Sequence, residues 1–266
     1  MKENANLTET QAENTNPTEK KKDVYLTDDL FIVKKGYLME YYGDDVKEET
    51  LILPDDADVI TNNATHRFHD YAVMVVVPEG VKELDRSCFM HFEKMVDLTL
   101  PQSLEAICDS AFYYCKSLTQ LYLPDSIGEI GGKFIEGTSI EEIALPKALP
   151  CPSHWMFDMA SNLKVVRMSD EQFELMLYSA FRKSKNDPHA KELRNSDYVP
   201  FGNSGLKTLV VDGVEYDGPS LRSYIMQDFS FSDSIKNPSV NTTLLRENFK
   251  IVEDMFIGTP FFKNSP

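Results

Sequence analysis

The chain has 266 residues, of which 42% are hydrophobic, and its 43 acidic and 27 basic side chains give a formal net charge of −16. This hydrophobic content is ordinary for a globular protein, while the excess of negative charge repels nucleic acid phosphates and anionic lipid headgroups and argues against both as partners. The longest apolar runs, such as residues 72–77, fall far short of the roughly 18–20 residues of a membrane-spanning helix, so membrane insertion is not expected.

The first 23 residues are rich in Asn, Thr, Glu and Lys. Because such a segment cannot bury enough apolar surface to order itself, we expect residues 1–23 to be a disordered tail. The segment also lacks the apolar core of a secretory signal, which indicates a cytoplasmic protein, or an exported one if an export signal has been removed.

Residues 24–54 read as an N-terminal entry hairpin followed by a first strand. The stretch 31–43, FIVKKGYLMEYYG, has two apolar segments on either side of a Lys-Gly pair, and LILP follows at residues 51–54. Glycine favours tight turns because it accepts positive φ angles, so a strand-turn-strand unit is predicted here.

Prolines mark a repeat along the middle of the chain. Five of them are spaced 24, 23, 23 and 22 residues apart, at Pro54, Pro78, Pro101, Pro124 and Pro146. Apolar residues lie three positions and one position before each proline, and in most copies also three and six positions after it. Three copies have an aromatic residue eleven positions after the proline, at Phe89, Phe112 and Phe157. A period of about 20–29 residues containing L-x-x-L-x-L is typical of a leucine-rich repeat solenoid.

The spacing also predicts how the copies pack. Side chains three positions and one position before the proline share one face of a short strand, because side chains alternate along a strand. One copy cannot cover that face alone, so we expect the copies in residues 54–168 to stack in a parallel ladder. Proline then ends each strand because it has no N–H to donate.

The most regular copy carries a recognisable motif. It consists of Leu118, Leu121, Leu123 and Pro124, with Ala111-Phe112-x-x-Cys115 before it. This pattern resembles the BspA-like bacterial leucine-rich repeat, and residues 31–43 resemble the entry unit of such chains. The resemblance implies an α/β repeat fold, a short solenoid with 22–24-residue repeats. It also implies a role in protein interaction or surface adhesion, often in exported proteins.

The C-terminal part departs from the repeat. Ser169 and Gln172 form a capping box ahead of apolar residues at helical spacing, which predicts a helix over residues 170–184 and a helix-and-loop insertion over 169–205. A last strand is expected at residues 206–211, followed by helices from Pro219 and over 243–256. The terminal turns of a solenoid need covering, so residues 206–266 are predicted to form a helical cap, with a partner-binding helix as the alternative.

Four residues have a spacing that resembles a zinc site. They are Cys88, His91, Cys108 and Cys115. In the repeat frame Cys88 and Cys115 fall at core positions, where free cysteine packs as a small apolar residue, so we expect Cys88, Cys108 and Cys115 to be packed thiols and predict no metal. The sequence contains no G-x-S-x-G, Walker or G-x-G-x-x-G motif, and we predict neither a cofactor nor catalysis.

The outward side of the strand ladder is the candidate binding surface. Concave strand faces of solenoids commonly contact partners. The partner-binding residues predicted there are Met74, Val76, Asp97, Thr99, Gln120, Tyr122, Glu142 and Arg167. Tyr122 and Arg167 are the expected anchors, because Tyr and Arg are enriched among residues that dominate binding energy. The alternative is that this side is only a solvated sheet face.

The sequence therefore predicts a non-enzymatic scaffold that binds a protein or peptide on its concave face. A surface-attachment or structural module of an exported bacterial protein is the alternative. An enzyme is the third hypothesis, and it would require a polar cluster in the loop 184–205 to face the sheet.

Overall fold

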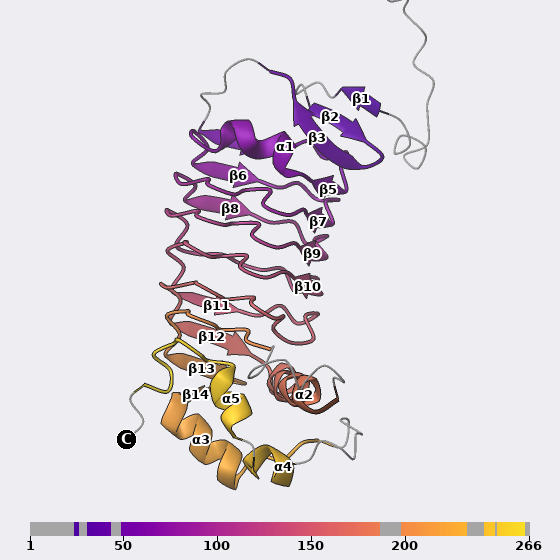
Figure 1. Cartoon of the computed structure of the whole chain (residues 1–266). Helices are drawn as coiled ribbons and strands as arrows, with labels where there is room; N and C mark the ends of the chain where they lie inside the picture. The colour runs from indigo at the N-terminus through magenta and orange to yellow at the C-terminus, as the bar shows by residue number, and fades with distance from the viewer. Residues whose placement is uncertain are drawn as a thin grey trace, which may run out of the picture.

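A computed structural model describes residues 24–26, 31–43, 49–186, 198–232, 242–247 and 249–263. The disordered tail predicted for residues 1–23 lies outside them. The chain winds into a solenoid in which short parallel strands form two ladders on opposite sides, with most of the helices at the C-terminal end (Figure 1). This is the repeat architecture that the proline spacing predicts.

The solenoid begins with an antiparallel meander. Its strands are β1 (Val24–Leu26), β2 (Phe31–Lys34) and β3 (Tyr37–Tyr41). Lys35 and Gly36 connect β2 to β3 with φ angles of 53° and 83°, and positive φ at both central residues is the mark of a two-residue hairpin turn whose twist matches the strands. Since β3 pairs in parallel with the first repeat strand of one sheet, the predicted entry hairpin covers the N-terminal end of that sheet.

One ladder contains the strands that precede the prolines. Its first part is β4 (Thr50–Ile52), β6 (Met74–Val76) and β8 (Asp97–Thr99). Its second part is β11 (Glu142–Ala144), β12 (Val165–Met168), β13 (Thr208–Val211) and the antiparallel β14 (Val214–Tyr216). The parallel strands pair in the register of the repeat, with Met74 opposite Asp97 and Glu142 opposite Val165. The outward side of these strands and of residues 120–122 is called the ladder face below.

The copy at residues 118–123 corrects one expectation. It was predicted to be a strand, yet it has no strand pairing, and in the part of the chain described no backbone hydrogen bond joins residues 119–123 to a neighbouring turn. The side chains nevertheless keep strand parity, because Leu121 is buried while Gln120 and Tyr122 are exposed. The ladder is thus interrupted in the middle of the solenoid without a change in which side chains face the core.

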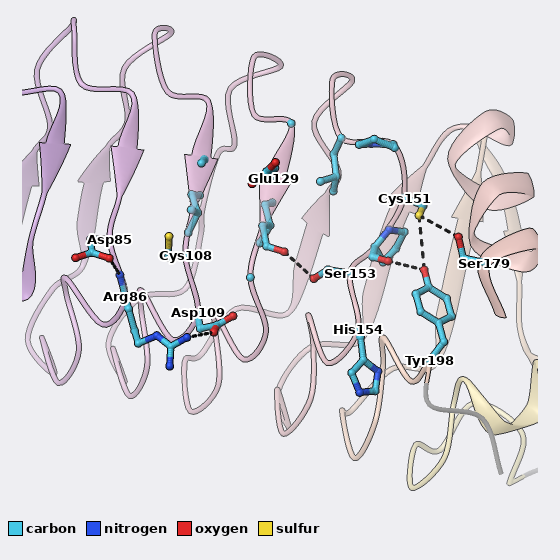
Figure 2. Close-up of a pocket in the computed structure, with 18 residues that line it drawn as sticks. Asp85, Arg86, Cys108, Asp109, Glu129, Cys151, Ser153, His154, Ser179 and Tyr198 are labelled. Atoms are coloured by element: carbon cyan, nitrogen blue, oxygen red, sulfur yellow. Dashed lines mark hydrogen bonds and ion pairs between the residues drawn. The ribbon is translucent and has the colours of Figure 1, made fainter. Parts of the chain in front are cut away.

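The other ladder contains the strands that follow the prolines. It is made of β5 (Val59–Ile60), β7 (Glu83–Leu84), β9 (Ala106–Ile107) and β10 (Glu129–Ile130), which continue the sheet of β1–β3. The sheet stops after β10, where Pro150 and Pro152 remove two N–H donors and restrict φ. At this point the Ser153 hydroxyl donates to the Ile130 carbonyl oxygen over 2.6 Å in place of a backbone N–H (Figure 2).

A column of aromatic rings fills the core. The rings of Phe89 and Phe112 are stacked 5.9 Å apart, with an interplanar angle of 2°. Phe157 stacks in the same way on Phe201, at 5.6 Å and 1°, and Phe201 stacks on Phe256 of the C-terminal cap. The three aromatic residues that follow the prolines by eleven positions are fully buried, and the column extends beyond the copies that the prolines mark.

The N-terminal repeats contain little helix, only α1 (Asn62–Thr65) and the 3-10 turn η2 (His66–Phe68). The main helix, α2 (Asp170–Asn186), begins with the predicted capping box, in which the Ser169 N–H donates to Gln172 Oε1 and the Gln172 N–H donates to Ser169 Oγ. The Gln172 side chain also donates to the carbonyl oxygens of Pro146 and Leu149, at 2.8 and 2.7 Å. This amide therefore fastens the start of α2 to the preceding turn.

After α2 the chain returns to the solenoid. Backbone N–H groups of Trp155, Phe157 and Met159 donate to carbonyl oxygens in residues 199–202, so residues 198–205 run beside 155–161 as the next turn. The cap consists of α3 (Gly218–Gln227), α4 (Thr242–Glu247) and α5 (Lys250–Asp254). None of the helices in the described ranges is both long enough and apolar enough to span a bilayer.

The alternation of side chains at residues 118–123 can be tested by a pair of substitutions. Leu121→Ala removes a side chain that is 7% exposed and should lower the free energy of unfolding by roughly 2–5 kcal/mol. Substitution of the exposed neighbour Gln120 by alanine should lower the free energy of unfolding by less than about 0.5 kcal/mol. Denaturant unfolding measures both, and equal effects would show that the side-chain assignment is wrong.

Two adjacent glycines test how closely the turns approach. A Cβ at Gly131 would lie 2.4 Å from the backbone N of Asp109, whereas one at Gly132 would lie 3.5 Å from its nearest neighbour. Gly131→Ala should therefore destabilise the protein by roughly 1–3 kcal/mol through overpacking. Gly132→Ala is the matched control and should leave the midpoint of thermal unfolding nearly unchanged. Tolerance of both substitutions would contradict the close contact.

Candidate functional site

The ladder face gathers all the residues predicted to bind a partner. Seven of the eight side chains are exposed and Val76 is half-buried. They come from β6, β8, residues 120–122, β11 and β12, so the repeat aligns on one surface residues that lie up to 93 positions apart in the sequence (167 − 74). The geometry brings the predicted set together on one surface, and its binding of a partner stays a prediction.

Tyr122 dominates the middle of the ladder face. Its side chain is 79% exposed, and its hydroxyl donates to Gln120 Oε1 over 3.1 Å. Beside it lies a groove of about 790 Å³, lined by residues 119–123 on one side and 141–145 on the other. The groove coincides with the interruption of the strand ladder, so the most exposed aromatic ring of the face stands at its edge.

The C-terminal half of the ladder face is charged, and its charges are paired between turns. The Arg167 guanidinium lies against the Glu142 carboxylate, the Lys164 ammonium against Glu141, and the Lys147 ammonium against Asp125. The pKa of the exposed Asp125 carboxyl is lowered by its hydrogen bond to Lys147. Exposed pairs of this kind contribute little to stability. Arg167, predicted as an anchor, is therefore paired with Glu142, and a partner would contact both side chains.

The N-terminal end of the ladder face is apolar. Ile52 on β4 is 63% exposed and Met74 on β6 is 40% exposed, and Val76 lies next to them in the paired register. Exposed large apolar side chains that gather on one surface are more informative than scattered ones, because contiguous apolar patches are uncommon on monomeric proteins. The ladder face thus changes from apolar at one end to charged at the other.

The zinc-like quartet does not converge. Cys88 and Cys115 are fully buried in the core, and the Cys115 thiol donates to the Phe89 carbonyl oxygen over 3.1 Å. Burial raises the pKa of Cys88, so this thiol keeps its proton. His91 lies 3.9 Å from Glu93 in a partly exposed position. The two core cysteines are packed as the repeat frame predicts.

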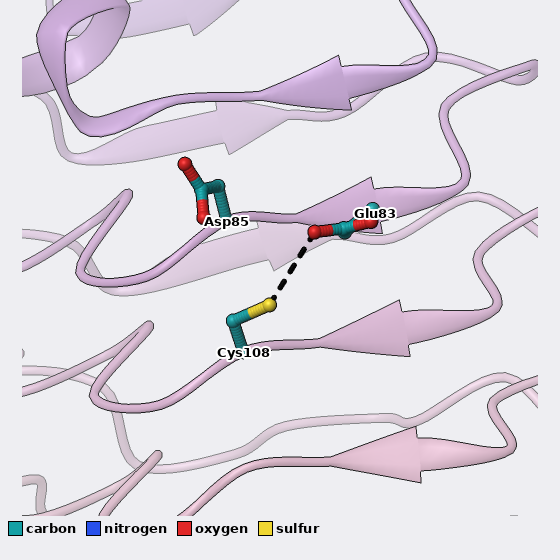
Figure 3. A group of neighbouring side chains, drawn as sticks. All are labelled: Glu83, Asp85 and Cys108. Carbon is teal, nitrogen blue, oxygen red and sulfur yellow. Dashed lines mark hydrogen bonds between the residues drawn. The ribbon is translucent and has the colours of Figure 1, made fainter.

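Cys108 corrects the expectation of a packed thiol. It follows β9 on the outward side of the second ladder, half-buried, and its Sγ donates to Glu83 Oε1 over 3.4 Å (Figure 3). Glu83, Asp85 and Cys108 offer three possible metal-ligand atoms within 4.8 Å of one another, the one such group in the ranges that the structure describes. Sequence reasoning missed this group, although Asp85 and Cys108 occupy the same position after successive prolines.

The group does not favour a thiolate. Burial first, and then the hydrogen bond and charge of Glu83, raise the pKa of Cys108 to about 12. At neutral pH the thiol is therefore protonated, and a metal ion would have to displace that proton before the sulfur could bind it.

The enzyme hypothesis required a polar cluster in the loop 184–205 to face the sheet. Residues 187–197 lie outside the described residues. The described end of that segment, at 198–205, forms a turn of the solenoid beside residues 155–161.

The raised pKa of Cys108 predicts slow alkylation. At pH 8 the native thiol should react with iodoacetamide on the order of a thousandfold more slowly than the unfolded chain, because only the thiolate attacks. Glu83→Gln removes a carboxylate that disfavours the thiolate, so the rate at Cys108 should rise several-fold. Mass spectrometry of the peptide that contains Cys108 measures both rates.

The matched control is Glu105→Gln. This substitution makes the same change in charge at a carboxylate that lies 3.8 Å from Lys82 on the same sheet. It should leave the alkylation rate of Cys108 unchanged. Equal acceleration by both substitutions would assign the effect to overall charge rather than to the contact with Glu83.

Solved structures of three bacterial proteins are among those similar to this chain. A leucine-rich repeat protein of T. pallidum is 25% identical with a TM-score of 0.45, and the alignment covers 56% of this chain and 70% of that one. The pneumococcal vaccine antigen PcpA is 20% identical with a TM-score of 0.41, and the alignment covers 56% of this chain and 36% of that one. A leucine-rich repeat protein from Bacteroides ovatus is 15% identical with a TM-score of 0.40, and the alignment covers 58% of this chain and 50% of that one. The chain thus spans about a third to a half of the latter two proteins.

A comparison with curated proteins found no match. Comparison with protein families gives a match to the BspA type leucine-rich repeat region, with six copies over residues 49–187. The matched copies include the strands of the ladder face from β4 to β12 and extend through α2. Because this match covers more than half of the 266 residues, the chain belongs to the BspA-type leucine-rich repeat family.

Proposed function

We propose that the chain is a non-enzymatic scaffold that binds a protein or peptide on the ladder face, with Tyr122 and the adjacent groove at the centre of the contact. The observation that carries the proposal is the 79% exposure of the Tyr122 side chain at the edge of a groove of about 790 Å³. Membership of a repeat family whose stacked turns present an extended surface supports it.

Tyr122 is suited to binding because a partner can bury both its ring and its hydroxyl. The residues opposite it in the neighbouring turns are small, Thr99 and Ala144, so the ring stands above the sheet. Tyrosine has few rotatable bonds and offers a large amphipathic surface, so ordering it on binding costs little entropy. Desolvation of this one side chain can therefore contribute a large share of the binding energy.

The ladder face also indicates the character of the partner. An extended partner that runs along the solenoid axis would meet Ile52 and Met74 at one end and the Glu142–Arg167 pair at the other. We therefore propose a partner with an apolar segment and a polar or charged segment. The net charge of −16 supports a protein or peptide over nucleic acid, because phosphates would be repelled.

Two substitutions test the role of the ladder face. Peptides selected on the intact chain from a displayed random library serve as the probe, and isothermal titration calorimetry measures their affinity. Tyr122→Ala should weaken binding by about 1 kcal/mol or more, which is roughly a fivefold increase in Kd. Arg167→Glu places two carboxylates together at Glu142 and should weaken binding by a similar amount.

The control is Tyr114→Ala, which truncates a half-buried tyrosine of the same turn that does not line the groove beside Tyr122. It should leave Kd within a factor of two, and thermal unfolding of each variant shows whether the fold survives. If both ladder-face variants bind normally, while substitutions in the C-terminal helices abolish binding, the solenoid acts only as a spacer and the proposal is wrong.

A further inference from the structure

A second cavity lies on the other ladder, away from the ladder face. It has a volume of about 680 Å³ and extends over the outward surface of β9 and β10 (Figure 2). Residues 149–154 and α2 form its wall at the C-terminal end. The binding scaffold proposed above makes no use of this cavity.

The cavity exists because small residues replace larger ones on the outward surface. Gly128 occupies the position that Glu105 has in the previous turn, and Gly131 the position of Cys108. Ala106 on β9 is also small and lines the floor. No strand follows β10 in this sheet. The proline-rich segment 149–152 takes that place and closes the C-terminal end of the cavity.

Part of the wall is apolar, next to the polar side chains of Ser153, His154 and Ser179, and hydrogen bonds hold the wall in place. Leu149, Pro150 and Pro152 line it. The Tyr198 hydroxyl donates to the Pro152 carbonyl oxygen and approaches Cys151 Sγ at 3.7 Å. These contacts tie the wall to the turn that follows α2, so the shape of the cavity does not depend on a ligand.

The charges around the cavity are unbalanced. Asp85 and Glu129 both line it, and neither carboxylate has an ion pair in the described part of the chain. Arg86, the single Lys or Arg among the lining residues described, is paired with Asp109 over 2.7 Å. Beside apolar groups an uncompensated charge attracts a counter-charge more strongly than in open water. The cavity thus combines a partly apolar wall with a negative floor.

We propose that this cavity binds a small organic cation, an ammonium or guanidinium group on a short apolar stem. The head lies toward Glu129, two turns from Asp85 at the far end of the cavity, and the stem contacts Leu149, Pro150 and Pro152. The volume of about 680 Å³ is within the usual range of small-molecule sites, about 300–1,000 Å³. The negative charge favours a cation, and the apolar part of the wall favours a cation with an apolar stem over an inorganic ion.

The test uses a pair of probes that differ in charge. Hexylammonium and 1-hexanol have the same stem, and only the former carries a positive charge at pH 7. Each is titrated into the intact, isotope-labelled chain in the presence of EDTA, and amide chemical shifts are followed by NMR. We expect saturable shifts at residues 106–108, 128–131 and 149–154, with an affinity for hexylammonium at least about tenfold higher than for hexanol.

Matched variants separate the cavity from general attraction to an acidic protein. Glu129→Gln should weaken hexylammonium binding at least about fivefold. Glu105→Gln removes the same charge from the same sheet outside the cavity and should change Kd less than twofold. Gly128→Leu should also block binding, and the fold should tolerate it because a Cβ there meets only the Ala148 carbonyl oxygen, at 3.8 Å.

Three outcomes would overturn the proposal. Hexanol could bind as tightly as hexylammonium, or the two glutamate variants could weaken binding equally, or the shifts could scatter over the acidic surface without saturating. Thermal unfolding of each variant accompanies the titrations, so loss of the fold is not mistaken for loss of the site. Failure here leaves the ladder-face proposal intact, because neither the probes nor the variants involve Tyr122.

Discussion

The parallel register between successive turns is the constraint on which the rest of this solenoid depends. A single turn cannot bury its own hydrophobic face, so it is stable only when the next turn places its own leucines and phenylalanine against it. The same register aligns the stacked rings of Phe89 and Phe112 in the core and pairs β6 with β8 on the ladder face. Polar contacts follow it as well, since Arg86 meets Asp109 and Lys116 meets Glu93 one turn apart.

Both candidate sites arise where this register loses its backbone hydrogen bonds. On the ladder face the bonding is interrupted at residues 119–123, and the groove beside Tyr122 lies there. On the other side the strands stop after β10, and the second cavity opens between that edge and residues 149–154. A regular repeat presents a uniform surface, so a site of defined shape requires a local departure from it.

The two cavities differ in their electrostatics, although the chain as a whole is strongly acidic. Near Tyr122 the carboxylates of Glu141 and Glu142 are neutralised by cations from the following turn. In the second cavity neither Asp85 nor Glu129 has an ion pair with any of the side chains that the structure describes. The first surface therefore favours a partner that brings apolar and aromatic contacts, whereas the second favours one that brings a positive charge.

The sequence by itself determined the repeat, the alternation of buried and exposed side chains, the capping box of α2 and the composition of the ladder face, because each follows from local periodicity. Tertiary structure alone decided the rest. The pairing gap at residues 119–123 and the contact between Glu83 and Cys108 depend on how two turns approach each other. Phe201 stacks on Phe157 in the aromatic column although α2 lies between them in the sequence. Hydrogen bonds between strands and the shapes of cavities depend on contacts between two turns, so the residue pattern within one turn cannot predict them.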